Sequence, residues 1–204
     1  MFITFEGIDF CGKSTQAKLL LDYFKKLKKK AILVREPGGT YISEKIRDIL
    51  LDKENHNMKF LTEFLLFSAA RQQLVKEVII PHLKKNFIVI CDRYYDSSTA
   101  YQGYGGNLDL KYVNMINTIA TDGLNPDLTF LIHIDYKENL IRKEIANNPD
   151  DRIEQKKRTY YKKVIKGYLD IATNEKRVII IEGKKPICVI QKEIIHIIKK
   201  QKKI

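Results

Sequence analysis

Short apolar runs alternate along the chain with longer segments that have helical spacing. The runs show little of the apolar–polar alternation of a half-exposed strand, as expected for strands that are covered on both faces. They occupy residues 1–5, 31–34, 87–91, 128–134 and 178–181. Helical spacing or helix-forming composition occupies residues 14–29, 41–52, 59–84, 109–121, 137–145, 153–174 and 187–200. This alternation predicts a three-layer α/β domain, with about five parallel strands and helices on both faces of the sheet.

Length and composition favour one cytoplasmic domain. The chain has 204 residues, 44% of them hydrophobic, and no linker-like stretch divides it, so residues 1–204 are expected to share one core. No window approaches the roughly 18 consecutive apolar residues of a membrane span, and no basic leader precedes the first strand. We therefore expect no membrane contact. Three widely spaced cysteines, Cys11, Cys91 and Cys188, suit reduced thiols better than disulfides or a zinc site.

The charge of the chain allows two interpretations. A formal net charge of +12 and a pI near 9.4 are compatible with a nucleic-acid-binding face. Much of the excess is lysine, in runs at residues 25–30, 162–163 and 199–203. Runs of this kind at helix ends usually form solvated faces, where cations favour the helix C-terminus. We favour this second interpretation and expect no specific nucleic-acid partner.

A glycine-rich loop lies between the first strand and the first helix. Residues 7–14 have the spacing G-x-x-x-x-G-K-S, in which backbone N–H groups and the helix N-terminus cradle phosphates. Lys13 is expected to reach the β- and γ-phosphates of a nucleoside triphosphate, and the Ser14 hydroxyl to bind Mg²⁺. The candidate ATP-binding residues of the loop are Gly7, Ile8, Asp9, Phe10, Cys11, Gly12, Lys13, Ser14 and Thr15.

Polar clusters also follow the second and third predicted strands. Residues 35–40 read R-E-P-G-G-T, and Asp92 and Arg93 follow the apolar run 87–91. The carboxyl ends of parallel strands share one edge of the sheet, so these clusters should meet the glycine-rich loop there. Asp92 could hold the metal or its water shell, and the planar guanidinium of Arg93 could clamp a second phosphate. Convergence of a metal and cations on phosphates is what phosphoryl transfer requires.

The chain resembles the thymidylate kinase family over nearly its whole length. The motifs that carry the resemblance are F-E-G-I-D at 5–9, R-E-P-G-G-T at 35–40, L-L-F-S-A-A-R at 65–71, D-R-Y at 92–94, S-S-T-A-Y-Q-G at 97–103, P-D-L-T at 126–129 and D-R-I-E at 151–154. The resemblance implies a P-loop NTPase fold, an enzyme that transfers the γ-phosphoryl group of ATP to dTMP in dTTP synthesis, Mg²⁺ as cofactor, and a homodimer.

The family's base-binding roles fall on five residues of this chain. The resemblance implies that Phe67 stacks on thymine and that Arg71 donates to O4. Their spacing of four residues puts both side chains on one helix face. Ser98 and Gln102 would read the remaining polar edge, and Tyr101 would crowd the ribose 2′ position. Thymine differs from uracil only by a methyl group, so the preference for dTMP over dUMP should be modest. Cytosine would present a hydrogen-bond donor to Arg71 and should be rejected more strongly.

The resemblance also implies a pocket for the acceptor phosphate and sugar. Asp9 corresponds to the acidic residue that binds the 3′-hydroxyl. Arg93 would hold the acceptor phosphate, with Glu36 and Arg47 supporting the pocket and Pro37 giving its loop a rigid shape. Lys13, Arg93, Arg152 and Asp9 are therefore the candidate catalytic residues.

Two departures from the family pattern concern positive charge. Phe10 occupies a loop position where some relatives carry arginine, so a cation must come from elsewhere. The resemblance is to the bacterial type of the family, in which a flexible lid supplies it; here the lid is expected near residues 142–153, which offer Arg142, Lys143 and Arg152. Arg152 is the preferred lid arginine, with Arg142 second, either on the donor phosphates or beside adenine. Residues 104–107 read Y-G-G-N, and an arginine common in relatives is missing there.

Three other functions compete with dTMP phosphorylation. Another nucleoside or nucleotide kinase would share the phosphate loop but not the motifs at 35–40 and 97–103. A nucleotide-dependent switch or a nucleic-acid-binding ATPase would have no use for an acceptor pocket. A catalytically inactive relative would be expected to have lost residues such as Lys13 or Arg93, which this chain retains.

Overall fold

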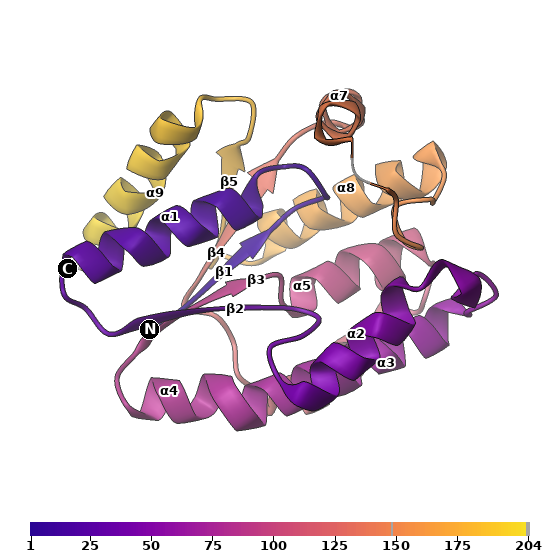
Figure 1. Ribbon diagram of the computed structural model, residues 1–204, viewed down its shortest axis with the longest axis horizontal. Helices are drawn as coiled ribbons and strands as arrows, with labels where there is room; N and C mark the ends of the chain where they lie inside the picture. The colour runs from indigo at the N-terminus through magenta and orange to yellow at the C-terminus, as the bar shows by residue number, and fades with distance from the viewer. Residues whose placement is uncertain (148, 203–204) are drawn as a thin grey trace.

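The computed structural model describes residues 1–147 and 149–202 of the chain. Its centre is a sheet in the order β2-β3-β1-β4-β5 (Figure 1). The strands are β1 (Phe2–Glu6), β2 (Ala31–Arg35), β3 (Ile88–Asp92), β4 (Leu128–His133) and β5 (Val178–Glu182). All strand pairings are parallel, which confirms the predicted sheet.

Helices cover both faces of the sheet. They are α1 (Lys13–Lys26), α2 (Tyr41–Leu51), α3 (Phe60–Leu74), α4 (Ile80–Lys84), α5 (Tyr95–Ser98), α6 (Leu110–Thr121), α7 (Tyr136–Ala146), α8 (Arg158–Asn174) and α9 (Ile187–Lys202), with a 3-10 turn η1 (Lys53–Asn55) and π-helical stretches η2 (Val75–Ile79) and η3 (Thr99–Gly105). Helices α1 and α9 lie on one face, and α3, α4, α5 and α8 lie on the other (Figure 1). The predicted three-layer α/β architecture is therefore confirmed.

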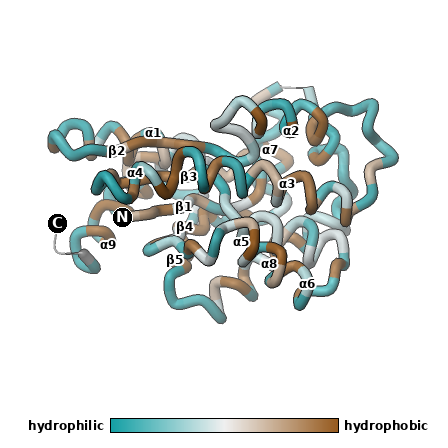
Figure 2. The backbone as a smooth tube through the Cα atoms, turned by 90° about the horizontal axis from the view of Figure 1, so that it is seen from below, coloured by the Kyte–Doolittle hydropathy of each residue, from teal (hydrophilic) through white to brown (hydrophobic). Residues whose placement is uncertain are grey.

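Side-chain alternation in β1 divides the core between the two faces. Ile3 and Phe5 pack in the cluster that contains Leu20 of α1, whereas Phe2 packs in the cluster that contains Leu74 and Val75 on the opposite face. In Figure 2 hydrophobic residues concentrate in the central strands and the helices beside them, and peripheral loops are mainly hydrophilic. Within the described residues no helix is long and apolar enough to cross a bilayer.

The strand register brings the polar clusters to one edge. Phe5, one residue before the end of β1, and Arg35 at the end of β2 both pair with Asp92 at the end of β3. The glycine-rich loop, the segment 36–40 and the segment after Asp92 therefore leave the sheet side by side. Lysines 25, 26 and 28–30 lie at the opposite end of the sheet, where all are exposed, as expected for a solvated helix end.

The sequence prediction missed the short 3-10 turn η1 and one longer helical stretch. Residues 95–105, which form α5 and η3, are rich in serine, threonine and glycine, which have weak helix propensity. Packing against α8 stabilises them instead. A Cβ on Gly105 would lie 2.6 Å from a ring carbon of Tyr160 on α8, and one on Gly103 would lie 2.8 Å from Leu110. Tertiary contact overrides local propensity here.

The predicted helix 153–174 is wrong at its N-terminal end, because α8 begins at Arg158. The preceding residues form a turn in which one Asp151 carboxylate oxygen accepts the backbone N–H groups of Ile153 and Glu154, at 2.8 and 2.9 Å. This side-chain cap offers the backbone an alternative to the helix. The predicted lid, residues 142–153, includes residue 148, which lies outside the described residues.

Candidate active site

The glycine-rich loop joins β1 to α1 in a conformation that only some residues tolerate. Gly7 has φ 136°, and a Cβ there would lie 2.5 Å from the Ile132 carbonyl oxygen. Gly12 caps α1 with φ 98°. A hollow at the loop is lined by Asp9, Phe10, Gly12, Lys13, Ser14, Thr15, Arg142 and Glu154. Backbone N–H groups at the α1 N-terminus make this hollow suited to phosphate.

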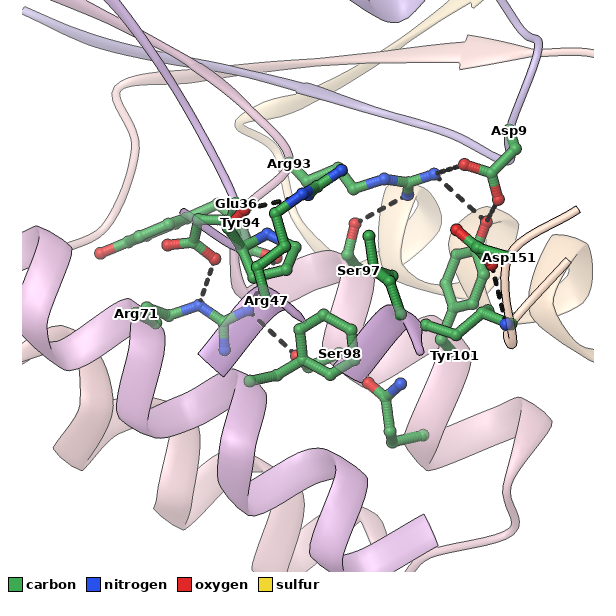
Figure 3. Close-up of a pocket in the computed structure, with 15 residues that line it drawn as sticks. Asp9, Glu36, Arg47, Arg71, Arg93, Tyr94, Ser97, Ser98, Tyr101 and Asp151 are labelled. Carbon is green, nitrogen blue, oxygen red and sulfur yellow. Dashed lines mark hydrogen bonds and ion pairs between the residues drawn. The ribbon is translucent and has the colours of Figure 1, made fainter. Parts of the chain in front are cut away.

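A second pocket opens beside the loop (Figure 3). Its lining comes from the glycine-rich loop, β2–α2, α3, the segment from the end of β3 through α5 and η3, and the turn before α8: Asp9, Glu36, Pro37, Arg47, Leu51, Phe67, Arg71, Arg93, Tyr94, Ser97, Ser98, Tyr101, Gln102, Asp151 and Ile153. Every residue that the sequence assigned to the acceptor site lies here. Asp9 lines both this pocket and the loop hollow, so the two spaces adjoin at one carboxylate.

Arg93 links the residues where the two spaces adjoin. Its Nη2 lies 2.6 Å from an Asp9 carboxylate oxygen, and its Nη1 donates to the Gly7 carbonyl at 2.9 Å and to Ser97 at 3.1 Å (Figure 3). Burial opposes the charge of Asp9, but the nearby Arg93 and Lys13 outweigh burial and lower the pKa of Asp9 below its usual range. Arg93 has φ 70°, an unfavourable value for a non-glycine residue. These contacts hold its guanidinium against the second pocket.

Arg71 lies at the opposite wall of the pocket and is almost fully buried. Its Nε donates to Glu36 at 2.7 Å and its Nη2 donates to Ser98 at 3.0 Å (Figure 3). Asn117 accepts from its Nη1 at 3.3 Å. Burial raises the pKa of Glu36 to about 7, although the attraction of Arg71 opposes this shift. The guanidinium is thus fixed in one orientation beside Phe67.

The segment after β2 is shaped by carbonyl contacts at Pro37. The Glu36–Pro37 peptide bond is cis, and the Pro37 carbonyl accepts from Arg47 Nη1 at 3.0 Å and from Arg35 at 2.6 Å. Arg35 also pairs with Glu44 of α2. The R-E-P-G-G-T motif therefore folds onto the start of α2 and brings Arg47 to the pocket rim.

Glu6 is a buried residue of the site that sequence reasoning missed. One carboxylate oxygen accepts the Tyr94 N–H at 2.7 Å, and the other accepts from the hydroxyls of Ser97 at 2.5 Å and Tyr168 at 3.1 Å. Ser97 in turn accepts from Arg93. The signal available in the sequence was a glutamate at the end of an apolar strand, next to the phosphate loop. Glu6 supports Arg93 from beneath, away from the pocket lining.

Replacing Glu6 with glutamine is expected to remove a pH-dependent part of the stability. Burial, reinforced by the charge of Asp96, raises the pKa of Glu6 from 4.5 to about 7. Between these values the folded protein keeps a proton that the unfolded chain releases, so the free energy of unfolding falls as pH rises and levels off above about 7. Urea denaturation at about pH 5 and about pH 8 measures this change. From the lower to the higher pH, the free energy of unfolding of the wild type should fall by about 2–3 kcal/mol more than that of Glu6→Gln. A pH-independent difference between the two proteins would contradict this role.

Arg142 and Arg152 occupy different places. Arg142 donates to the loop carbonyl of Cys11 at 3.2 Å and to Gly183 at 2.8 Å, and it lines the loop hollow. Arg152 is 5% exposed, and its Nη1 forms an ion pair with Glu63 of α3 at 2.7 Å. The structure thus brings Arg142 to the phosphate loop, whereas Arg152, the preferred lid arginine, is turned toward α3. The D-R-I-E sequence could not reveal this, because the partner lies far away in the chain.

Two residues fit the requirements of a magnesium site. Ser14 places a hydroxyl at the phosphate loop, and Asp92 at the end of β3 has a buried carboxylate oxygen without a hydrogen-bond partner among the described residues. Magnesium is commonly held by one or two such protein oxygens together with phosphate oxygens and water. No cluster of three potential ligands from histidine, cysteine, aspartate and glutamate occurs in the described part of the chain. This donor set suits a metal that arrives with a nucleotide.

Comparisons with known proteins agree on one family. Residues 5–194 match the family model described as thymidylate kinase. The thymidylate kinase of Sulfurihydrogenibium sp. (strain YO3AOP1) is 44% identical over 201 residues, which cover 98% of this chain and 97% of the relative. That of Geotalea daltonii is 46% identical over 189 residues, covering 89% and 88%. The crystal structure of thymidylate kinase from Ehrlichia chaffeensis aligns with a TM-score of 0.80 and 34% identity, covering 98% of both chains.

Proposed function

The chain belongs to the thymidylate kinase family, and we propose how its own residues transfer the γ-phosphoryl group of ATP to dTMP, giving dTDP and ADP. The observation that carries the proposal is the sharing of Asp9 between a phosphate-loop hollow and a pocket with base-binding side chains. Two adjoining sites of this kind hold a donor and an acceptor nucleotide with their phosphates facing. The single kinase domain comprises residues 1–204, with its lid at 142–153.

The donor nucleotide occupies the glycine-rich loop. Backbone N–H groups of residues 7–15 hold the phosphates, and Lys13 neutralises charge on the transferring group. Arg142 lines the loop hollow and also an adjacent cavity toward Gly183 and Ile187. We assign that cavity to adenine, with Arg142 beside the ring, and thus prefer Arg142 over Arg152 as the cation on the donor side.

Magnesium accompanies the nucleotide. Ser14 and Asp92 would hold the ion or its water shell, and the ion supplies positive charge to the phosphates when bound. The Asp92 carboxylate oxygen that has no hydrogen-bond partner in the described part of the chain supports this assignment.

The acceptor nucleotide occupies the second pocket. Phe67 stacks on thymine, and Arg71 donates to O4 from the orientation fixed by Glu36 and Ser98. Tyr101 donates to Asp9 at 3.1 Å, so its ring closes the space that a ribose 2′-hydroxyl would need.

Asp9, Arg93 and Arg47 then position the reacting end of dTMP. Asp9 accepts the sugar 3′-hydroxyl, and Arg93 clamps the acceptor phosphate with Arg47 and the Pro37 loop at the rim. Catalysis consists of alignment and of cations that match the charge spread over the transferring group.

An acceptor panel tests this function. ADP release should be measured with ATP, Mg²⁺ and each of dTMP, dUMP, UMP, dCMP and dGMP, beside a control without acceptor and one with DNA. We expect activity that requires an acceptor, is greatest with dTMP, and falls moderately with dUMP and strongly with dCMP. Hydrolysis without an acceptor, or stimulated by DNA, would instead support a nucleic-acid-dependent ATPase.

We further propose a homodimer formed through the outer faces of α2, α3 and α6. Adjacent helices here expose apolar side chains at helical spacing: Ile42, Ile49, Leu61, Leu65, Met115 and Ile119. A symmetric pairing of two such faces would bury them. A cytoplasmic location, where ATP and dTMP are found, and the absence of a specific nucleic-acid partner complete the proposal.

Replacing Leu65 with glutamate is expected to give a monomer. The side chain is 48% exposed on α3, and in a two-fold pairing the new charge would be buried or would face its own copy. Sedimentation velocity should show about half the mass of the wild type. Leu140→Glu, at a similarly exposed leucine on α7, is the matched control and should leave the mass unchanged. Equal masses for wild type and Leu65→Glu would contradict this interface.

A further inference from the structure

Glu63 is a fully buried carboxylate that none of the functions above employs. It lies in the first turn of α3 and is not part of the pocket lining. One oxygen accepts from Gln102 Nε2 at 2.8 Å, and the other lies 2.7 Å from Arg152 Nη1. An acidic side chain with no exposed surface needs compensation of this kind, because burying an unpaired charge is costly. The ion pair with Arg152 supplies it.

Arg152 is itself fixed from a third element. Its Nε donates to the Leu50 carbonyl at 2.8 Å, and its backbone N–H donates to Leu51 at 3.3 Å. The end of α2 therefore holds Arg152, and Arg152 holds Glu63. The position of the Glu63 carboxylate is determined by two elements besides its own helix.

This fixed carboxylate determines which way the Gln102 amide points. An ionised carboxylate only accepts hydrogen bonds, so Gln102 must turn its NH₂ group toward Glu63. Its carbonyl Oε1 then remains as an acceptor, and among the described residues it receives no hydrogen bond. Gln102 lines the acceptor pocket together with Arg71 and Phe67. The pocket wall thus presents a fixed donor, Arg71, and a fixed acceptor, Gln102 Oε1.

We propose that Glu63 is a positioning residue that makes the enzyme select pyrimidines with a hydrogen on N3. This inference rests on the proposed placement of the acceptor base beside Phe67. Thymine and uracil carry an acceptor at O4 and a donor at N3, which complement Arg71 and the Gln102 carbonyl. Cytosine carries a donor at C4 and an acceptor at N3, so both positions are mismatched. Without Glu63 the Gln102 amide could rotate by half a turn and offer N3 of cytosine a donor.

The double variant Glu63→Gln/Arg152→Met tests the proposal. It removes both charges of the buried pair together, a change that proteins often tolerate, whereas removing one partner leaves a buried charge. A glutamine at position 63 can donate or accept, so it no longer dictates the orientation of Gln102. If the double variant does not fold, as judged by thermal melting, Glu63→Gln/Arg152→Gln gives the same comparison, because it also removes both charges and lets the two amides hydrogen-bond to each other. Lys156→Met is the matched control, because Lys156 lies over the Phe60 and Tyr160 rings close to this cluster and forms no hydrogen bond to Glu63.

The measurement is kcat/KM for dTMP, dUMP and dCMP with each protein. We expect kcat/KM for dCMP relative to dTMP to rise about tenfold in the double variant, and to stay unchanged in Lys156→Met. The dUMP to dTMP ratio should not change, because these bases differ only by a methyl group. An unchanged dCMP ratio, or an equal loss with all three nucleotides, would overturn the proposal and leave Glu63 a purely structural residue. Absence of dTMP phosphorylation by the wild type would refute the proposed function itself.

Discussion

Replacing Arg93 with methionine is expected to lower kcat/KM for dTMP by about 10³-fold, the lower end of what a phosphate-clamping arginine contributes. The guanidinium lies between the phosphate loop and the acceptor pocket, held by Asp9 and the Gly7 carbonyl. Methionine has similar length but no charge. In the proposed placement of dTMP, the acceptor phosphate would therefore lose its clamp and the transferring group one of its cations. Steady-state kinetics with varied dTMP and varied ATP measures the loss.

Comparing the effects on the KM for dTMP and on the KM for ATP identifies the role of Arg93. The KM for dTMP should rise and kcat should fall, while the KM for ATP should change much less, because Lys13 and the loop remain. Arg93→Lys is the matched control. It keeps the charge but loses the planar fork, so its activity should lie between those of the wild type and Arg93→Met. Near-normal turnover of Arg93→Met would refute the assignment.

Replacing Arg152 with alanine is expected to lower the free energy of unfolding by about 3–5 kcal/mol. The side chain is 5% exposed and compensates Glu63, which is 0% exposed. Its loss would leave an uncompensated buried carboxylate and release the contact with Leu50. Chemical denaturation monitored by circular dichroism measures the change, and kcat should be determined at a temperature where the variant is folded.

This outcome separates the two candidate lid arginines. If Arg152 were a catalytic arginine finger, as the sequence-based hypothesis expects, Arg152→Ala would lose turnover but keep the stability of the wild type. Arg142→Ala is the comparison, since its side chain is partly exposed and contacts the phosphate loop. We expect Arg142→Ala to raise the KM for ATP and to destabilise the fold less than Arg152→Ala does. A stable Arg152→Ala with strongly reduced kcat would restore Arg152 to the donor site.

Local sequence patterns were enough to specify the sheet, most of the helices beside it and many of the side chains that line the proposed acceptor pocket. Uninterrupted apolar runs such as residues 87–91 become strands because only burial on both faces tolerates them. Contiguous motifs also allowed the site to be predicted, because a phosphate loop or the R-E-P-G-G-T segment acts through its own backbone. Residues such as Phe67 and Arg71, four apart on one helix, share a face whatever surrounds them.

The partners of single charged side chains depend on how distant segments pack together. Arg152 and Glu63 are distant in sequence, and no local pattern distinguishes a buried arginine from one that faces a nucleotide. The same holds for Glu6, whose hydroxyl partners on α5 and α8 are known only once these helices pack on β1. The helical stretch 95–105 also formed against local propensity, because contacts with α8 stabilise it. Local periodicity encodes which face is buried, whereas the pairing of buried polar groups depends on contacts between distant segments.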